Sequence, residues 1–257
     1  HAPSGLSAGA ELVQTLAAME AGFTPGAAPS PDSYACMADA LGAAYRDRLA
    51  HSGDTGESPQ APACTTTFSV VDRQGNMVNV TQTLLSMFGS HVVSPQTGML
   101  LNNGIMWFDP EQGGPNSLAP GKRCLMNICP TVGQAGDRMF AIGASGGRKI
   151  LPAVANLTSF MVDFGMDLET AIHTPRIDAS GSGSIVMDED LPVGKIARSQ
   201  PADVEAALAT CGEVKRAKRT VHPYAFAVPA GVMRRNGRNC GATEIMTPWG
   251  DAVAEDG

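Results

Sequence analysis

The sequence has few aromatic residues and no excess of positive charge. Phe, Trp and Tyr make up 5% of its 257 residues, and the formal net charge is -7. A chain of this charge is poorly suited to nucleic acid or to an anionic membrane surface, so we expect neither as a partner. The apolar runs are too short to span a bilayer. The hydrophobic content of 43% is typical of a globular protein.

The cysteines and histidines lack the spacings of known site types. The six cysteines include no CxxC pair, and the five histidines include no HxxxH or HxH pair, so we expect no metal and no cofactor. Free thiols are favoured over disulfides. No serine lies in a GxSxG motif, so a Ser-His-Asp triad is poorly supported. His173 is interpreted as a loop or core histidine.

The compartment is weakly defined. The chain begins at His1 and shows no signal peptide. A cytoplasmic location is favoured, and a periplasmic or secreted one stays open because the true N-terminus is not visible.

Helical spacing of apolar residues dominates the first fifth of the chain. It predicts a helix over Leu6–Ala21 and a second helix with Ser33 as its N-cap that continues to about Leu49. The segment His51–Ala63 is polar and rich in Gly and Pro, which is typical of an exposed, flexible connector.

After the connector, side chains alternate between two faces with a period of two residues, which is typical of strands. "TTTFSVV" and "MVNVTQT" read as two strands joined by a tight turn in "DRQGN". Pairing about Gln74 and Gly75 places Thr83 opposite Thr66, one residue from Thr65. Later segments predict a strand, a glycine turn and a helix over about Ile150–Phe164, then a helix over about residues 202–210. Helices before strands, with hairpins in place of regular βαβ units, predict an α+β fold.

The glycine-rich stretch "GASGGRK", residues 143–149, has three interpretations. It fails as a phosphate-binding P-loop because Arg148 separates the last glycine from Lys149. It is compatible with a tight strand-to-helix turn. It is also compatible with an anion-accepting pocket of glycine amides, which would stabilise a developing oxyanion.

Three threonines, Thr65 to Thr67, stand at the junction between connector and strand. They suit ordinary strand entry, because Thr is a good strand former. They also suit a cleavage site that exposes a nucleophile. The α-amine of an N-terminal Thr, with a pKa of roughly 7.7–8.0, can act as the base for its own hydroxyl. A hydroxyl at Thr83 would then hold the freed amine.

Combined motifs resemble the γ-glutamyltransferase family of N-terminal nucleophile hydrolases. "TTTFSVVDRQGNMVNVTQT" resembles the start of that family's small subunit, and "TGMLLNN", "PGKR" and "GASGGRKI" follow in its order and spacing. "PSGLSAGAELVQTL" resembles the end of the large subunit. The resemblance implies a four-layer αββα sandwich. It also implies self-cleavage before Thr65, with Thr83 beside the nucleophile's amine and an oxyanion hole at Gly146 and Gly147.

The same resemblance implies how the chain is divided. Residues 1–64 correspond to the C-terminal part of the large-subunit segment, and residues 65–257 correspond to the small subunit. Both parts would belong to one αββα domain and form a heterodimer after cleavage. Most of the family's large subunit precedes the position of His1, including an Arg that binds the substrate's α-carboxylate, so the chain is expected to be a fragment.

The substrate pocket departs from the well-known γ-glutamyl enzymes. An Asn, a Gln, an Asp and two Ser that hold the glutamyl head match, in turn, Leu85, Gly104, Trp107, Met126 and Asn127. "NNGIMWFDP" instead resembles an acylase-like subgroup. The positions expected to bind a small-molecule amide substrate are Thr67, Leu85, Asn103, Gly104, Trp107, Met126 and Asn127. We expect a less polar acyl group than glutamyl.

Two functions remain open from the sequence. The first, which we favour, is an amide hydrolase or acyltransferase that uses Thr65 on a γ-glutamyl or other N-acyl compound, similar to a glutathione hydrolase. The second is an unprocessed, catalytically silent relative that binds a ligand or a partner.

Overall fold

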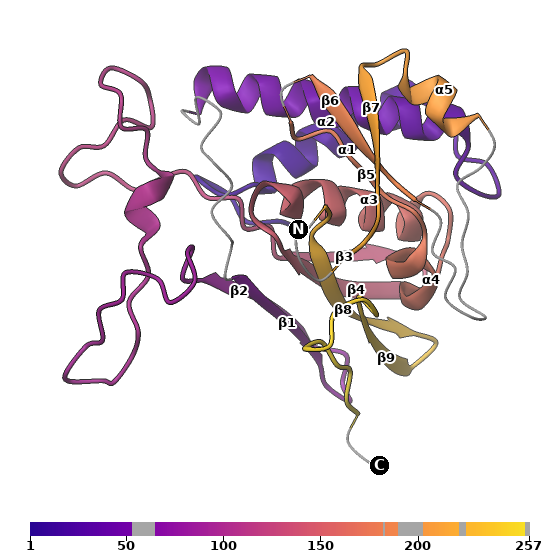
Figure 1. Cartoon of the computed structure of the whole chain (residues 1–257). Helices are drawn as coiled ribbons and strands as arrows, with labels where there is room; N and C mark the ends of the chain where they lie inside the picture. Colours follow the sequence, from indigo (N-terminus) through magenta and orange to yellow (C-terminus); the bar gives the residue numbers. More distant parts are fainter. Residues whose placement is uncertain (53–64, 182, 190–202, 221–224, 255–257) are drawn as a thin grey trace.

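A computed structural model describes residues 1–52, 65–181, 183–189, 203–220 and 225–254 (Figure 1). The predicted connector therefore lies largely outside the described residues, as does Cys64. The other five cysteines are free thiols, as predicted. The helices are α1 (Gly9–Gly22), α2 (Pro31–His51), α3 (Ile150–Val162), α4 (Leu168–His173) and α5 (Val204–Leu208), with short 3-10 turns η1 (Gly104–Trp107) and η2 (Gly147–Lys149).

The described strands form three sheets. A hairpin pairs β1 (Thr65–Val71) with β2 (Met77–Thr83). The central sheet has the order β3-β4-β8-β9, and its strands are β3 (Thr131–Ala135), β4 (Arg138–Ser145), β8 (Val228–Arg235) and β9 (Arg238–Thr243). A small sheet has the order β5-β6-β7, made of β5 (Ile177–Asp178), β6 (Ser184–Asp188) and β7 (Glu213–Ala217).

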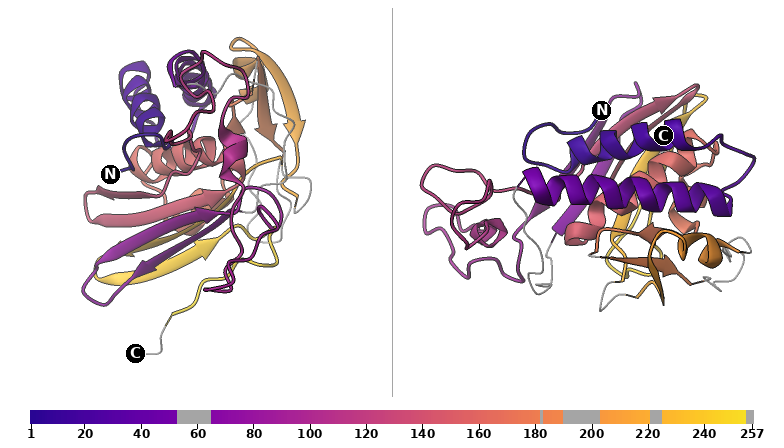
Figure 2. Two further views of the ribbon diagram at one scale, coloured as in Figure 1. Left: turned by 90° about the vertical axis from the view of Figure 1, so that its left-hand side faces the viewer. Right: turned by 90° about the horizontal axis from the view of Figure 1, so that it is seen from above.

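The elements lie in layers, and the α+β class is confirmed. α3 and α4 cover one face of the central sheet, and α1 packs on α3 next to α2 (Figure 2). The β1–β2 hairpin packs against β4 and β8. Of the four layers expected for an αββα sandwich, the described residues thus supply one helical layer and both β layers.

α3 is the centre of the core. Its sequence ILPAVANLTSFMV is apolar around nearly the whole helix, which is typical of a helix that is buried on every side. The one amide in it, Asn156, is fully buried and is satisfied by backbone groups: Nδ2 donates to the Pro152 and Ile177 carbonyls at 2.6 and 3.1 Å, and Oδ1 accepts from the Ile177 N–H.

The observed N-cap of α2 lies three residues before the predicted one. The N-cap is Ser30, whose hydroxyl accepts the Ser33 N–H, while the Ser33 hydroxyl accepts the Ser30 N–H at 2.8 Å. This capping box satisfies two backbone donors at once, and Pro31 suits the first turn of the helix. The prediction that Ser33 is the cap was therefore wrong, because Ser33 is the third residue of the helix and closes the box from position N3.

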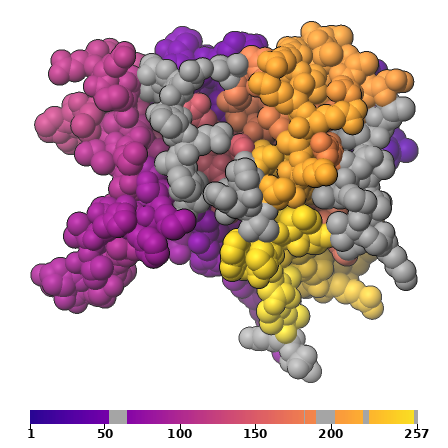
Figure 3. All heavy atoms as spheres, viewed as in Figure 1, coloured from indigo at the N-terminus to yellow at the C-terminus, as the bar shows by residue number. Residues whose placement is uncertain are grey.

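The outer face of the hairpin is apolar and uncovered among the described residues. Phe68, Val70 and Val78 are 46%, 55% and 55% exposed. The long connection between β2 and β3, drawn in magenta, projects from the layered body (Figures 1 and 3) and also exposes apolar side chains. No helix in the described part of the chain is long and apolar enough to cross a membrane.

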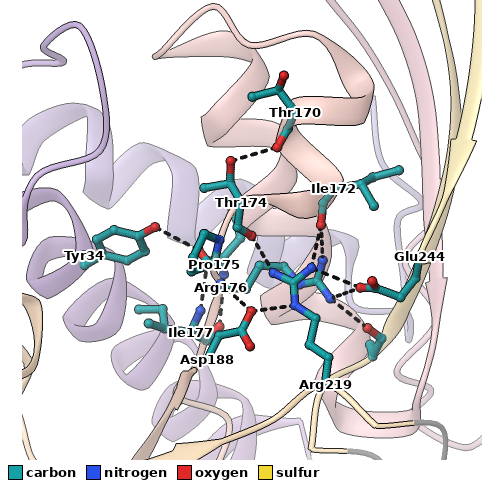
Figure 4. Close-up of polar contacts among 12 residues, drawn as sticks. Tyr34, Thr170, Ile172, Thr174, Pro175, Arg176, Ile177, Asp188, Arg219 and Glu244 are labelled. Atoms are coloured by element: carbon teal, nitrogen blue, oxygen red, sulfur yellow. Dashed lines mark hydrogen bonds and ion pairs between the residues drawn. The ribbon is translucent and has the colours of Figure 1, made fainter. Parts of the chain in front are cut away.

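Four buried charges tie the small sheet to the central one (Figure 4). Arg176 Nη2 lies 2.8 Å from Glu244 Oε2, and Arg219 bridges Asp188 Oδ2 at 2.5 Å and Glu244 Oε2 at 3.2 Å. The side chains are at most 3% exposed. Arg176 also donates to the Ala227 carbonyl at 3.2 Å. Two cations and two anions balance, so the cluster carries no net charge into the core.

We expect Glu244→Gln to destabilise the fold strongly. The variant leaves two buried guanidinium groups facing one carboxylate, and breaking a buried pair in this way costs about 3–5 kcal/mol. Urea unfolding measures the loss. Glu213→Gln is the control, because Glu213 pairs with Lys215 at an exposed site and such pairs contribute less than about 1 kcal/mol. Equal losses in the two variants would contradict the assignment.

The same carboxylate predicts a pH dependence. Burial alone would raise the pKa of Glu244, but Arg176 and Arg219 more than offset burial and hold its pKa below the ordinary value. A depressed carboxylate pKa contributes stability that is present above the unfolded-state pKa of about 4.3 and is lost as the pH falls through the folded-state pKa. Acidification below about pH 4.3 should therefore destabilise the wild type more steeply than Glu244→Gln.

Candidate active site

Thr65 and Thr83 face each other at the open end of the hairpin. The ladder pairs Thr65 with Thr83 directly, and the Thr65 hydroxyl donates to Thr83 Oγ1 at 3.1 Å. Both residues are half-buried. The prediction that Thr83 lies opposite Thr66 was therefore wrong by one residue.

The hairpin loop explains the difference. Asp72 and Asn76 pair through backbone and side chain, with Asp72 Oδ1 accepting the Asn76 N–H at 2.8 Å, so the loop holds three residues and not two. Its last residue, Gly75, has a φ of +93°, which glycine adopts without strain. Three-residue hairpin loops with a left-handed last residue are common. The symmetric two-residue turn assumed from sequence shifts the register by one.

The Thr83 hydroxyl is held from a second side. The Leu85 N–H donates to Thr83 Oγ1 at 2.9 Å. Leu85 has a φ of +71°, an uncommon conformation for a residue with a side chain. Strained backbone of this kind persists where the surroundings over-determine it, often at functional sites. The Thr83 oxygen is thus fixed beside the Thr65 hydroxyl.

Gly146 and Gly147 form the turn between β4 and α3. Their φ values are +144° and +61°, and η2 starts at Gly147. A Cβ on Gly146 would lie 2.8 Å from Ala227 Cα, so there is no space for a side chain. Among the turn and loop hydrogen bonds of the described residues, none is donated by the Gly146 or the Gly147 N–H. The geometry suits a tight turn, and it would allow the two N–H groups to donate hydrogen bonds to an anion.

A close contact between sheets joins the two halves of the site. A Cβ on Gly143 would lie 2.2 Å from Thr67 Oγ1, so β1 approaches β4 at a position that only glycine allows. The Thr67 hydroxyl lies 3.2 Å from Thr81 Oγ1 and 3.3 Å from the Val80 carbonyl. Thr67 therefore packs between the sheets.

Asn103 supports the segment after Thr83. Its Oδ1 accepts the Ser86 N–H at 3.0 Å, its Nδ2 donates to Ser86 Oγ at 2.8 Å, and its N–H donates to the Leu84 carbonyl. Gly104 lies against Trp107, since a Cβ there would be 3.6 Å from the indole ring. These residues bring the Leu85 segment and the Trp107 turn together.

Met126 and Asn127 lie on another segment and are held by α2. Arg48 Nη2 donates to the Met126 carbonyl at 2.9 Å and to Asn127 Oδ1 at 3.4 Å, while Nη1 pairs with Glu11 Oε1 at 2.6 Å. Sequence reasoning missed Arg48 and Glu11. A signal was present, because Arg48 is seven residues after Leu41 and so lies on the face of α2 predicted to be buried.

His173 is a core histidine, in agreement with the sequence interpretation. It is 3% exposed, and its Nδ1 lies 2.8 Å from the Glu169 carbonyl. Burial holds the pKa of His173 below its ordinary value. Within the described ranges, no group of His, Cys, Asp and Glu side chains has the arrangement of a metal site.

Comparison with known proteins gives a family match over most of the chain. A family model described as Gamma-glutamyltranspeptidase matches residues 43–248. That span includes α2 from residue 43 onward and every predicted site residue. It therefore covers both sides of the Thr65 junction.

Two curated relatives are similar over about half of the chain. The acylase ACY 1 proenzyme of Pseudomonas sp. (strain V22) is 36% identical over 144 residues, which are 56% of this chain and 26% of that protein. The glutathione hydrolase proenzyme of Bacillus subtilis (strain 168) is 34% identical over 129 residues, 50% of this chain and 22% of that protein. The match thus spans about a quarter of the length of each relative.

Solved structures show the same fold. The gamma-glutamyltranspeptidase from Pseudomonas nitroreducens complexed with L-DON matches with a TM-score of 0.58 at 22% identity, covering 74% of this chain and 100% of that chain. The cephalosporin acylase from Bacillus halodurans matches with a TM-score of 0.77 at 21% identity, covering 100% of this chain and 51% of that chain. The predicted sandwich of the N-terminal nucleophile hydrolases is therefore confirmed.

The glycine turn gives a stability prediction that does not depend on activity. Gly146→Ala forces a side chain into a φ of +144° and against Ala227, so we expect a loss of about 2–4 kcal/mol in urea unfolding. Gly136→Ala is the matched control, because Gly136 has a φ of +59° with open space around it and should lose only about 1–2 kcal/mol. Losses of the same size would show that the contact with Ala227 is unimportant.

Proposed function

The chain belongs to the gamma-glutamyltranspeptidase family, and from this membership we propose that it is the catalytic part of an amide hydrolase or acyltransferase. In this proposal the protein cleaves itself before Thr65 and then uses Thr65 as its nucleophile. The observation that carries it is the contact between the Thr65 and Thr83 hydroxyls, 3.1 Å apart at the first residue of β1. The alternative of a silent, unprocessed relative has no comparable observation in its favour.

The first step is the self-cleavage. The Thr65 oxygen attacks the carbonyl carbon of residue 64, and the amide bond to Thr65 breaks as an ester to its hydroxyl forms. Water then hydrolyses the ester, which releases residue 64 as a carboxylate and frees the α-amine of Thr65. The Thr83 oxygen, fixed by the Leu85 N–H, orients the Thr65 hydroxyl for this attack.

The second step is acyl transfer. The freed α-amine takes the proton of the Thr65 hydroxyl, whose oxygen attacks the amide carbonyl of the substrate. The developing oxyanion would accept hydrogen bonds from the N–H groups of Gly146 and Gly147. Loss of one such donor typically lowers turnover by roughly 10²–10³. The leaving amine takes the proton from the α-ammonium. Water or an acceptor amine then removes the acyl group from Thr65.

The polar groups around the acyl position support a weakly polar substrate. Asn103 is one candidate to replace the missing glutamyl-binding side chains, but its carboxamide oxygen and nitrogen both bond to Ser86. Leu85 and Trp107 supply apolar surface, and neither can pair with an ammonium or a carboxylate. Burying either charge without a partner costs several kcal/mol. We therefore propose an aliphatic or aromatic acyl group.

Self-cleavage is tested on the full-length protein. We expect the wild type to give two fragments, one of them starting at Thr65, and Thr65→Ala to give a single uncut chain because no hydroxyl can attack. Thr65→Ser is the control that keeps the hydroxyl and should still cleave. The readouts are a denaturing gel and N-terminal sequencing. A cut in the alanine variant, or a fragment that starts elsewhere, would rule out Thr65.

Acyl preference is tested with matched anilides on the processed enzyme. We expect kcat/KM for a γ-glutamyl anilide to fall roughly 10²–10⁴ below that for an apolar acyl anilide, since two charge-assisted contacts of about 1.5–3 kcal/mol each are missing. Trp107→Asp adds a carboxylate that can pair with the glutamyl ammonium, so it should shift the preference toward glutamyl. A wild-type preference for the glutamyl anilide would overturn the pocket argument.

A further inference from the structure

Two buried side chains of α2 reach two different loops of the candidate site. Tyr45 and Arg48 lie three residues apart, so they are neighbours on one face of the helix. They are 4% and 2% exposed. Tyr45 extends to the turn that follows Gly147, and Arg48 extends to the Met126–Asn127 segment.

Arg48 holds its segment at a high cost in desolvation. Its guanidinium pairs with Glu11 of α1 and donates to the Met126 carbonyl at 2.9 Å, yet Arg48 Nε and Glu11 Oε2 have no partner among the described residues. A buried ion pair of this kind contributes little to stability compared with well-packed apolar residues, and such pairs are best attested as devices that fix one arrangement. The arrangement fixed here is that of the segment at Met126 and Asn127.

Tyr45 holds the glycine turn. Its hydroxyl donates to the carbonyl oxygen of Arg148, which belongs to η2 directly after Gly147. The Lys149 N–H donates to the Gly146 carbonyl at 3.3 Å across the same turn. With the Arg148 carbonyl held, the peptide plane that follows it cannot rotate freely, and the turn that presents the Gly146 and Gly147 amides is restrained.

We propose that Tyr45 and Arg48 are positioning residues that hold the oxyanion turn and the substrate segment from behind, without touching the substrate. The inference rests on the proposed function, in which Gly146, Gly147, Met126 and Asn127 serve catalysis and binding. Both side chains precede the proposed cleavage point. The part of the chain before Thr65 therefore completes the site after cleavage through these non-covalent contacts.

Tyr45→Phe tests the hold on the oxyanion turn, with Tyr34→Phe as its matched control. Tyr34 lies on the same helix, is equally buried, and also donates to a backbone carbonyl, that of Pro175 at 2.8 Å, away from the site loops. We expect Tyr45→Phe to lower kcat for an amide substrate roughly 5- to 10-fold with KM within about two-fold, as expected for losing one neutral hydrogen bond that supports the transition state. Tyr34→Phe should leave kcat unchanged. Equal kcat values in the two variants would overturn the role of Tyr45.

Arg48→Lys tests the hold on the substrate segment. The lysine keeps the charge that faces Glu11 but lacks the planar fork that reaches Glu11 and the Met126 carbonyl together. We expect KM for the same amide to rise roughly 10-fold with a smaller change in kcat. An unchanged KM in a folded variant would remove Arg48 from the proposal.

Amide hydrogen exchange separates this proposal from the proposed function. Exchange at residues 146–149 should speed up in Tyr45→Phe but not in Tyr34→Phe, and exchange at residues 126–128 should speed up in Arg48→Lys. If the wild type neither cleaves itself nor hydrolyses amides, the proposed function fails while the exchange result still decides whether α2 restrains the two loops. Unaltered exchange in both variants would overturn the restraint itself.

Discussion

Thr65 and Thr83 meet because Asp72 and Asn76 close a loop of three residues and Gly75 accepts a left-handed conformation. Side chains alternate between the two faces of a strand, so a slip of one residue would pair Thr83 with Thr66, which is exposed. The contact between the Thr65 and Thr83 hydroxyls and the contact between the Thr67 and Thr81 hydroxyls both depend on this register. A short, exposed loop at one end of the hairpin thereby determines which hydroxyls meet at the other end.

Glycines decide how closely the site's elements approach one another. Gly143 lets the Thr67 hydroxyl contact β4, and Gly146 lets the turn pass against Ala227. A methyl group at either position would meet atoms at under 3 Å, a separation that real side chains do not tolerate. The hairpin can therefore approach β4, and the turn can pass against Ala227, only because these two positions between β4 and α3 have no side chain.

Buried guanidinium groups support the site from two directions. Arg176 bonds to the carbonyl of Ala227, the residue that packs against Gly146, and Arg48 bonds to the carbonyl of Met126. Each guanidinium is paired with a buried carboxylate, Glu244 or Glu11. Buried charges are tolerated when they are paired, and here Nη2 of each guanidinium also fixes a backbone carbonyl next to the candidate site.

The sequence by itself determined the local elements, because helix periodicity, strand alternation and glycine turns are properties of neighbouring residues. It indicated the family through the resemblance of several motifs in the same order and spacing. It identified the Thr65 junction, the Gly146–Gly147 turn and the apolar character at Leu85 and Trp107. Tertiary structure alone decided the hairpin register, which a single loop residue changes, and the commitment of Asn103 to Ser86. It also gave Tyr45 and Arg48 their contacts. Both residues read from sequence as one face of an ordinary helix, since hydrogen bonds to Arg148 and Met126, about 80 or more residues away, leave no local pattern.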